Sequence, residues 1–136
     1  MKLILYYAPS FWFKTYKKIL DEVPESEMEV AVENAVVVFY QAEEEDSEKK
    51  SSVISKFAKN VKWLAGKFNT KTIVLHSFSH LSMSKAAPEL TNEIITDVKE
   101  RLSRTGYLIT ETPFGYLNEW KMHVAGESLA KVFKEF

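Results

Sequence analysis

The 136-residue chain contains no cysteine, only four glycines and no long apolar run. The absence of cysteine excludes disulfides, thiolate metal ligands and a cysteine nucleophile. So few glycines leave no glycine-rich loop that could cradle a phosphate. No apolar run reaches the ~18 residues that a membrane span needs. The apolar stretch that opens the sequence is too short for a signal peptide. We therefore expect a soluble, cytoplasmic protein that uses no cofactor.

The charges nearly cancel, since the formal net charge is -1. No overall basic field indicates nucleic-acid binding, so any RNA contact needs a local patch. Residues 11–20 are one candidate, because four aromatic residues are interleaved there with lysines, as in single-stranded RNA sites. Aromatic residues packed inward beside solvated lysines give the same pattern. The length, without any linker or repeat, predicts one domain over residues 1–136.

Short runs of aliphatic and aromatic residues predict the strands. The first run ends at Pro9-Ser10, and residues 11–20 after it predict a short helix or an irregular loop. Two runs on either side of Glu33-Asn34 predict a β-hairpin, because a two-residue connection ending in asparagine suits a tight turn. The predicted strands cover residues 2–8, 28–32, 35–41, 72–75, 107–110 and 116–124.

Apolar residues spaced three and four apart predict two amphipathic helices. The first follows the acidic run at residues 43–46 and ends near Gly66, and the second begins near Pro88 and ends before Gly106. A short last helix is predicted over residues 127–135. This mixture of strands and helices predicts an α/β fold, a single layered domain with a mixed β-sheet and packed helices. The two apolar faces consist of Val53, Phe57, Val61, Leu64 and Phe68, and of Leu90, Ile94, Ile95, Val98 and Leu102.

Polar residues follow the aliphatic run at residues 72–75 and indicate a site at the end of a buried strand. His76 and His80 lie four residues apart, which suggests metal chelation, but no glutamate lies between them and no third ligand follows. We therefore expect no metal, and we interpret His76 as a structural histidine. No G-x-S-x-G motif is present, and no acid stands in a recognisable relation to His80. The residues alone thus predict a pocket but no named reaction.

Asn118 interrupts an apolar face of the strand predicted over residues 116–124. Tyr116, Trp120 and Met122 share that face, so Asn118 needs a hydrogen-bond partner or a function. An edge-strand asparagine that reaches water is the alternative. Both interpretations remain open at the level of the residues.

Five short motifs stand out in chain order: Phe78-Ser79-His80-Leu81-Ser82, Ala86-Ala87-Pro88, Gly106-Tyr107, Thr112-Pro113-Phe114-Gly115-Tyr116 and Gly126-Glu127-Ser128-Leu129-Ala130. Together they resemble the N-terminal editing domain of archaeal threonyl-tRNA synthetases. The resemblance implies a fold like that of D-aminoacyl-tRNA deacylases, a homodimer, and metal-free hydrolysis of serine mischarged on threonine tRNA. It also implies that backbone groups hold most of the substrate and that the 2′-hydroxyl of the terminal adenosine helps to activate water.

The resemblance also implies roles for individual residues. His80 corresponds to the pocket histidine of the family, and Asn118 stands where the family has a catalytic lysine. Lys131 stands where the family has a glutamate. We therefore assign His80 and Asn118 as the candidate catalytic residues. The candidate substrate-binding residues are Ala42, Phe78, Ser79, Tyr116 and Lys131.

The two departures from the family pattern leave two classes of function open. Asparagine can orient a water molecule, but it carries neither a charge nor a transferable proton. The first class is an editing deacylase that acts on seryl-tRNA for threonine, or a D-aminoacyl-tRNA deacylase. The second class is a catalytically weak or inactive module of the same fold that binds tRNA or assists a threonyl-tRNA synthetase. The expected partners are the aminoacyl end of tRNA, the synthetase and a second copy of the chain, without a membrane.

Overall fold

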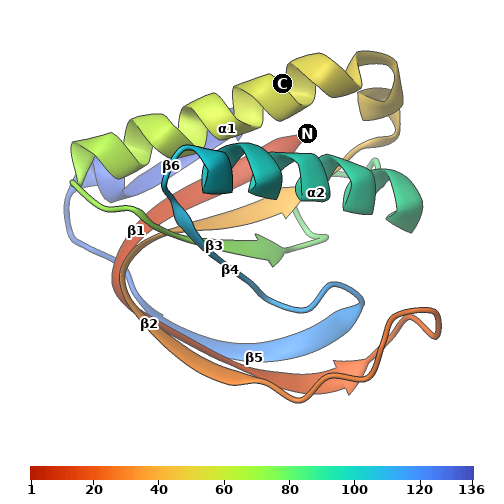
Figure 1. The fold of residues 1–136 in the computed structure, drawn as a ribbon, viewed down its shortest axis with the longest axis horizontal. Helices are drawn as coiled ribbons and strands as arrows, with labels where there is room; N and C mark the ends of the chain where they lie inside the picture. The colour runs from red at the N-terminus through yellow and green to blue at the C-terminus, as the bar shows by residue number, and fades with distance from the viewer.

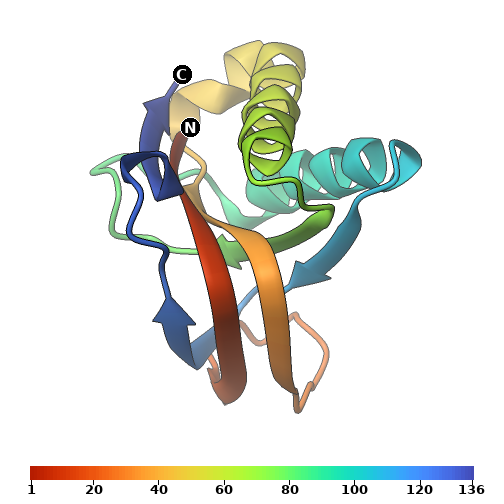
Figure 2. The same ribbon diagram turned by 90° about the vertical axis from the view of Figure 1, so that its left-hand side faces the viewer.

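The computed structural model describes residues 1–136 as a curled mixed β-sheet with helices on one face (Figures 1 and 2). The strands are β1 (Lys2–Lys18), β2 (Glu29–Gln41), β3 (Thr72–Ser77), β4 (Leu108–Glu111), β5 (Tyr116–His123) and β6 (Lys131–Glu135). The helices are α1 (Lys50–Lys67) and α2 (Pro88–Arg104), with short 3-10 helices η1 (Glu44–Lys49) and η2 (Ser128–Ala130). None of the helices is long and apolar enough to cross a membrane. The predicted fold class, a layered α/β arrangement with a mixed sheet, is confirmed.

The sheet has the order β4-β3-β2-β1-β5. β3 runs parallel to both β2 and β4, whereas β1 is antiparallel to all its partners. β6 pairs with the first residues of β1, and β5 pairs with its second half. Figure 2 shows that β1 and β2 extend well beyond the helices, and Figure 1 shows that they curl there together with β5.

The main core lies between the two helices and the sheet. Both predicted apolar faces point into it, with Phe57, Leu64, Ile94 and Leu102 fully buried, while Phe68 packs against it at the end of α1. Burying each large aliphatic or aromatic side chain stabilises the fold by roughly 1.5–3 kcal/mol, so packing fixes both helices on the sheet. A smaller core fills the opposite face, inside the curl. It consists of Ala8, Phe11, Phe13, Ala35, Val37, Phe39 and Val74.

β1 and β2 each pass through a residue pair that the sequence predicted to be a turn. β1 continues through Pro9-Ser10, and β2 continues through Glu33-Asn34, so the predicted helix or loop over residues 11–20 and the predicted hairpin are wrong. The flanking pairs Ala8↔Ala35 and Ser10↔Glu33 keep one register, which sets Pro9 opposite Asn34. Pro9 has no N–H to donate, and Asn34 adopts a left-handed conformation with φ 51°. Both residue pairs that are typical of turns therefore lie inside one continuous two-stranded ribbon, where they cause only a local irregularity of the backbone.

The C-terminal residues form a strand, so the helix predicted over residues 127–135 is wrong. Only the single turn η2 is helical, and β6 then pairs antiparallel with β1, with Phe133 opposite Ile4. An apolar spacing of three to four residues suits a helix, but the alternation from Lys131 to Glu135 also suits a strand. The open edge of β1 supplies backbone partners, and this long-range pairing decides between the two.

A buried group of charges joins the first residue to the end of β2. The Met1 amine donates to Glu43 Oε1 at 2.5 Å and to Asp46 Oδ1 at 2.8 Å. Glu43 Oε2 also accepts hydrogen bonds from Lys2 Nζ at 3.0 Å and from Ser82 Oγ at 2.6 Å. Burial alone raises the pKa of the Glu43 carboxyl, but these donors outweigh burial and lower the pKa to about 2.

We predict that this group makes the fold acid-sensitive. The pKa of Glu43 is lower in the folded chain than its ordinary 4.5. The stabilisation of the fold by the Glu43 carboxylate is therefore complete above pH 4.5 and is lost as the pH falls toward 2. Glu43→Gln should lower the free energy of unfolding at pH 7 by about 3 kcal/mol, and the difference from wild type should shrink toward pH 2. Urea denaturation at pH 7, 4.5 and 3 measures both effects.

Glu135→Gln is the matched control, since Glu135 pairs with the same Lys2 at 3.2 Å but is 62% exposed. It should change the free energy of unfolding by less than about 1 kcal/mol. If Glu43→Gln is as stable at pH 7 as this control, the stabilising role given to the buried charges is wrong.

Candidate functional site

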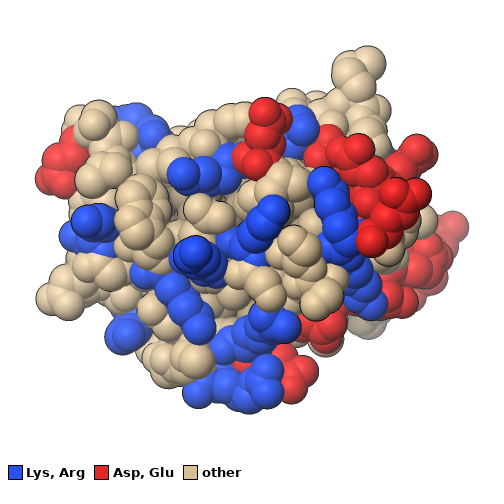
Figure 3. All heavy atoms as spheres, turned by 90° about the horizontal axis from the view of Figure 1, so that it is seen from above, with Lys and Arg blue, Asp and Glu red and all other residues tan.

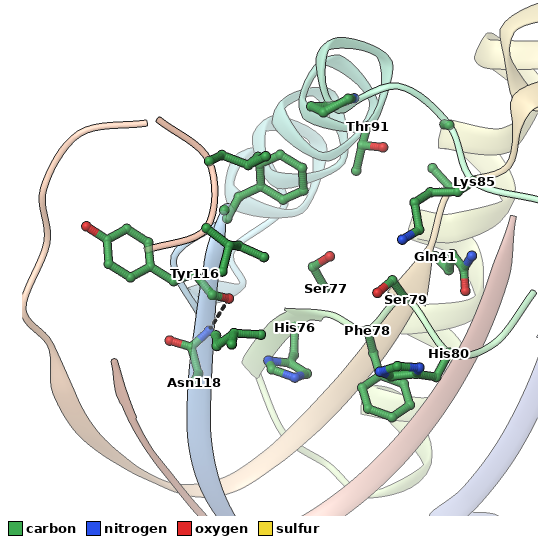
Figure 4. Close-up of a pocket in the computed structure, with 18 of the residues that line it drawn as sticks. Gln41, His76, Ser77, Phe78, Ser79, His80, Lys85, Thr91, Tyr116 and Asn118 are labelled. Atoms are coloured by element: carbon green, nitrogen blue, oxygen red, sulfur yellow. Dashed lines mark hydrogen bonds between the residues drawn. The ribbon is translucent and has the colours of Figure 1, made fainter. Parts of the chain in front are cut away.

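A cavity of about 320 Å³ opens beside the carboxyl ends of the parallel strands β2 and β3. The start of α2 covers one side of it, and the first residues of β5 form the opposite wall (Figure 4). Such a position is where ligands bind in sheets of this kind, and the volume lies at the small end of ligand pockets. Six of the seven candidate site residues from the sequence line this cavity together. They are Ala42, Phe78, Ser79, His80, Tyr116 and Asn118.

The loop that carries Ser79 and His80 is tied to β2 by Gln41. The Oε1 atom of Gln41 accepts from the backbone N–H groups of Leu81 and Ser82, each at 2.8 Å. Its Nε2 atom donates to the carbonyl oxygens of Ser82 at 3.0 Å and Ser84 at 2.9 Å. Gln41 is buried, so this amide exchanges no hydrogen bonds with bulk water, and it fixes the loop in place. The sequence analysis missed Gln41, although a polar residue at the end of the most apolar strand was a usable signal.

His76 lies under the cavity as part of an aromatic group. Its ring centroid is 4.7 Å from that of Phe39 and 6.2 Å from that of Trp120, and its Nδ1 lies 2.9 Å from Thr112 Oγ1. Burial lowers the pKa of His76 to about 4, so the ring is neutral near pH 7. No group of three or more histidine or acidic residues that could hold a metal ion is found in the chain. These contacts agree with the structural interpretation of His76.

His80 lies at the exposed rim of the cavity. Its ring packs edge-on against Phe78, with ring centroids 5.1 Å apart. None of the ion pairs of the chain involves it, so no carboxylate orients the ring as a proton carrier. The backbone N–H groups of Ser79 and His80 make no hydrogen bond within the chain, whereas those of Leu81 and Ser82 are taken by Gln41. The exposed rim of the cavity therefore carries two backbone N–H groups, those of Ser79 and His80, that have no hydrogen-bond partner within the chain.

Asn118 lines the wall opposite the loop (Figure 4). It pairs with Thr15 of β1 next to a register shift between Thr15 and Lys17. Such irregularities re-aim side chains and are common beside active sites. Its Nδ2 donates to Tyr116 O at a long 3.4 Å, while Oδ1 is buried and has no partner. An unpaired buried acceptor costs roughly 1–3 kcal/mol, so the Asn118 amide is incompletely paired in the wall of the cavity.

The side chains of Tyr116 and Lys131 are both directed away from the other candidate residues. The ring of Tyr116 turns away from the cavity in Figure 4, and its hydroxyl donates to Pro24 O at 3.1 Å and accepts from Ser26 N at 2.7 Å. Lys131 does not line the cavity. Its Nζ donates to Ala125 O at 2.9 Å and to Glu127 O at 3.4 Å, so within one chain it is not brought together with the other candidates.

Further polar residues line the cavity that the sequence analysis did not single out as site residues. Lys85 belongs to the loop before α2, and Thr91 lies on the inner side of the first turn of α2. Thr91 is buried, and its hydroxyl donates to Ala87 O at 3.2 Å. Thr91 lies one turn before Ile94 on the same helix face, so the apolar spacing of this helix could have indicated that Thr91 points inward. Nothing in the local sequence distinguishes Lys85 from a surface lysine.

Comparison with known proteins gives a consistent result over the whole chain. Residues 1–136 match the family model of the archaea-specific editing domain of threonyl-tRNA synthetase. The threonine--tRNA ligase of Hyperthermus butylicus is 28% identical over 100% of this chain and 23% of its own length. That of Staphylothermus marinus is 30% identical over 98% of this chain and 22% of its own length. The chain therefore spans less than a quarter of these curated relatives.

Solved structures show the same fold at low sequence identity. The c-Myc DNA Unwinding Element Binding Protein aligns with a TM-score of 0.67 and 14% identity, over 100% of this chain and 99% of that chain. At this identity the likeness concerns the fold alone. The family match covers every residue, and residues of three of the five motifs line the cavity described above. The chain belongs to the family of archaea-specific editing domains of threonyl-tRNA synthetase.

Proposed function

We propose that this chain is an editing deacylase that hydrolyses seryl-tRNA for threonine, the product of mischarging by a threonyl-tRNA synthetase. One observation carries the proposal: Ser79 and His80, whose backbone N–H groups have no partner within the chain, and Asn118, whose amide is incompletely paired, line one small cavity. Donors that meet an ester carbonyl and an acceptor that orients water are the groups that ester hydrolysis requires. Family membership supports the same activity, which belongs to the cytoplasmic machinery of translation.

The cavity suits a small aminoacyl group. Ala42 and Ala86, which are nearly fully buried, line it together with the buried Thr91. We place the aminoacyl group at this buried side, which leaves the nucleoside toward the exposed Ser79 and His80. The extra methyl group of threonine would change its binding by only about 1–3 kcal/mol, so discrimination from serine depends on how closely these small side chains pack.

The reaction is the attack of water on the ester carbonyl carbon. The bond between this carbon and the 3′ oxygen of the terminal ribose breaks, and serine and the free tRNA leave. In our proposal, the N–H groups of Ser79 and His80 stabilise the oxyanion, and the side-chain amide of Asn118 turns toward the cavity and orients the water. Because the Asn118 amide cannot take up a proton, the proton passes through the 2′-hydroxyl of the substrate to the leaving 3′ oxygen.

A second candidate function is a module of the same fold that binds the aminoacyl end without efficient hydrolysis. It is favoured by the lack of an oriented protein base in the cavity, since His76 is buried and has a pKa of about 4. His80 has no carboxylate partner, and Asn118 carries no charge. A deacylation assay distinguishes the two candidates.

The first prediction of this proposal is slow but measurable hydrolysis of seryl-tRNA, with threonyl-tRNA and D-aminoacyl-tRNA as comparison substrates. Asn118→Lys should raise the rate by about 10²-fold, because an ammonium group in the cavity stabilises developing negative charge. Glu119→Lys adds the same group to the neighbouring residue, which does not line the cavity, and should leave the rate unchanged. An unchanged or lower rate in folded Asn118→Lys would contradict the role of residue 118. No hydrolysis by either protein would favour the binding module.

We also expect His80 to bind substrate rather than to act as a base. His80→Ala should weaken binding of a non-hydrolysable seryl-adenosine analogue, as measured by calorimetry. The rate profile of the wild type should show no inflection near pH ~6.5, and the variant should keep its shape. His123→Ala is the control, since His123 ends β5 outside the cavity. If the wild type shows that inflection and His80→Ala abolishes it without loss of affinity, His80 is a general base.

The proposed assembly is a homodimer, for which exposed apolar strand surface is a physical reason. Phe133 on β6 is 53% exposed, and Leu129 just before this strand is 43% exposed. We expect light scattering at micromolar concentration to give the mass of two chains, and Phe133→Asp to shift it toward one. Leu108→Asp on the far edge strand β4, where Leu108 is 70% exposed, is the control and should leave the mass unchanged. A wild-type monomer would refute the dimer.

A further inference from the structure

Lys85 is the only lysine or arginine that lines the cavity. It is exposed, and it takes part in none of the ion pairs of the chain. The acidic residue nearest to it in the sequence is Glu89, four positions later at the start of α2, and none precedes it as far back as Glu48. A cation beside a cavity that forms no ion pair is available to bind an anion.

The backbone on both sides of Lys85 is fixed. Before it, Ser84 O accepts from Gln41 Nε2 at 2.9 Å, and Ser84 N donates to Ser82 Oγ at 3.1 Å. After it, Ala86 N donates to Ala42 O at 3.0 Å, and the Ala86 side chain is buried. The Cα of Lys85 is therefore held against the end of β2, unlike that of a lysine in a free loop. Figure 4 shows its ammonium end turned toward the hydroxyl groups of Ser77 and Ser79.

The charge around the site restricts where an RNA backbone can approach. Figure 3, which looks onto the helical face, shows lysines and arginines over much of that face and many acidic side chains gathered toward one end. η1, which follows the end of β2 directly, contributes the exposed Glu44, Glu45 and Glu48. Glu44 N donates to Ser84 Oγ at 3.0 Å, so this acidic turn adjoins the loop of Lys85. A phosphate that reaches the cavity past these carboxylates needs a local cation.

We propose that Lys85 forms a phosphate subsite at the mouth of the cavity. Its ammonium group binds the phosphodiester on the 5′ side of the terminal nucleoside, while the aminoacyl group lies at the buried side. This inference rests on the proposed function, because it takes the ligand to be the aminoacyl end of a tRNA. Lysine binds phosphate as a flexible point charge, so the contact tolerates the small movements that a substrate entering the cavity requires.

The test compares two ligands that differ only in this phosphate. They are a non-hydrolysable seryl-adenosine analogue, with serine joined through an amide to the 3′ position, and the same compound with a 5′-phosphate methyl ester. For the wild type, calorimetry should give about tenfold tighter binding of the phosphorylated ligand, as expected for one charge-assisted contact. In Lys85→Met, which keeps an unbranched side chain as long as the aliphatic stem of lysine but removes the charge, the two affinities should become equal. Lys85→Arg should retain most of the difference.

Lys59→Met is the control, because Lys59 is an exposed lysine of α1 that does not line the cavity. It should leave the affinity ratio of the two ligands unchanged. The subsite is refuted if the wild type binds both ligands equally, if neither binds, or if Lys59→Met lowers the ratio as much as Lys85→Met. It is also refuted if Lys85→Met weakens both ligands by the same factor, which would place Lys85 at the aminoacyl group instead. Deacylation by the wild type tests the proposed function separately, so the two failures are distinguishable.

Discussion

The buried amide of Gln41 holds together the part of the molecule on which the site depends. With its neighbours Ala42 and Glu43, it forms a row of three residues that each bind the loop before α2. Gln41 makes two hydrogen bonds through each end of its amide, and Glu43 joins the loop to the Met1 amine. A buried polar network of this kind is stabilising only when all its members are paired. The loop therefore has one arrangement, which sets the positions of His80 and Lys85.

The curl of the sheet provides the second half of the site. β1 and β2 are long enough to extend beyond the helices. The apolar residues on the sheet face opposite the helices form the smaller core. Phe39 of this core contacts the rings of Phe78, His76 and Trp120, with centroids 4.7 to 5.2 Å from its own. The aromatic group thus joins the floor of the cavity to the wall formed by β5. Packing on both faces of one sheet brings Asn118 across from the loop of Ser79.

Features that depend on local pattern could be predicted from the sequence, and features that depend on distant partners could not. The faces of α1 and α2 follow from spacing, and the end of α2 follows from Gly106, whose φ is 90°. Pro9 and Asn34 are strong turn signals, yet they face each other across a continuous ribbon, which a local pattern cannot reveal. The motifs located the cavity residues through family resemblance, but the roles of Gln41 and Lys85 arise from contacts between β2 and a loop some 40 residues later.

The position of β5 in the sheet has a consequence for how such domains evolve. β5 pairs only with β1, lies at an edge, and keeps all its side chains at least partly exposed, whereas residues 35–42 at the end of β2 are buried. A residue on β5 outside the aromatic group, such as Asn118, can therefore be exchanged with little loss of packing, while the end of β2 tolerates almost no change. The chemical group that residue 118 presents in the wall of the cavity can therefore change with little effect on the stability of the fold. Editing domains of this architecture could lose, regain or alter their activity through single substitutions on that strand while the cavity itself persists.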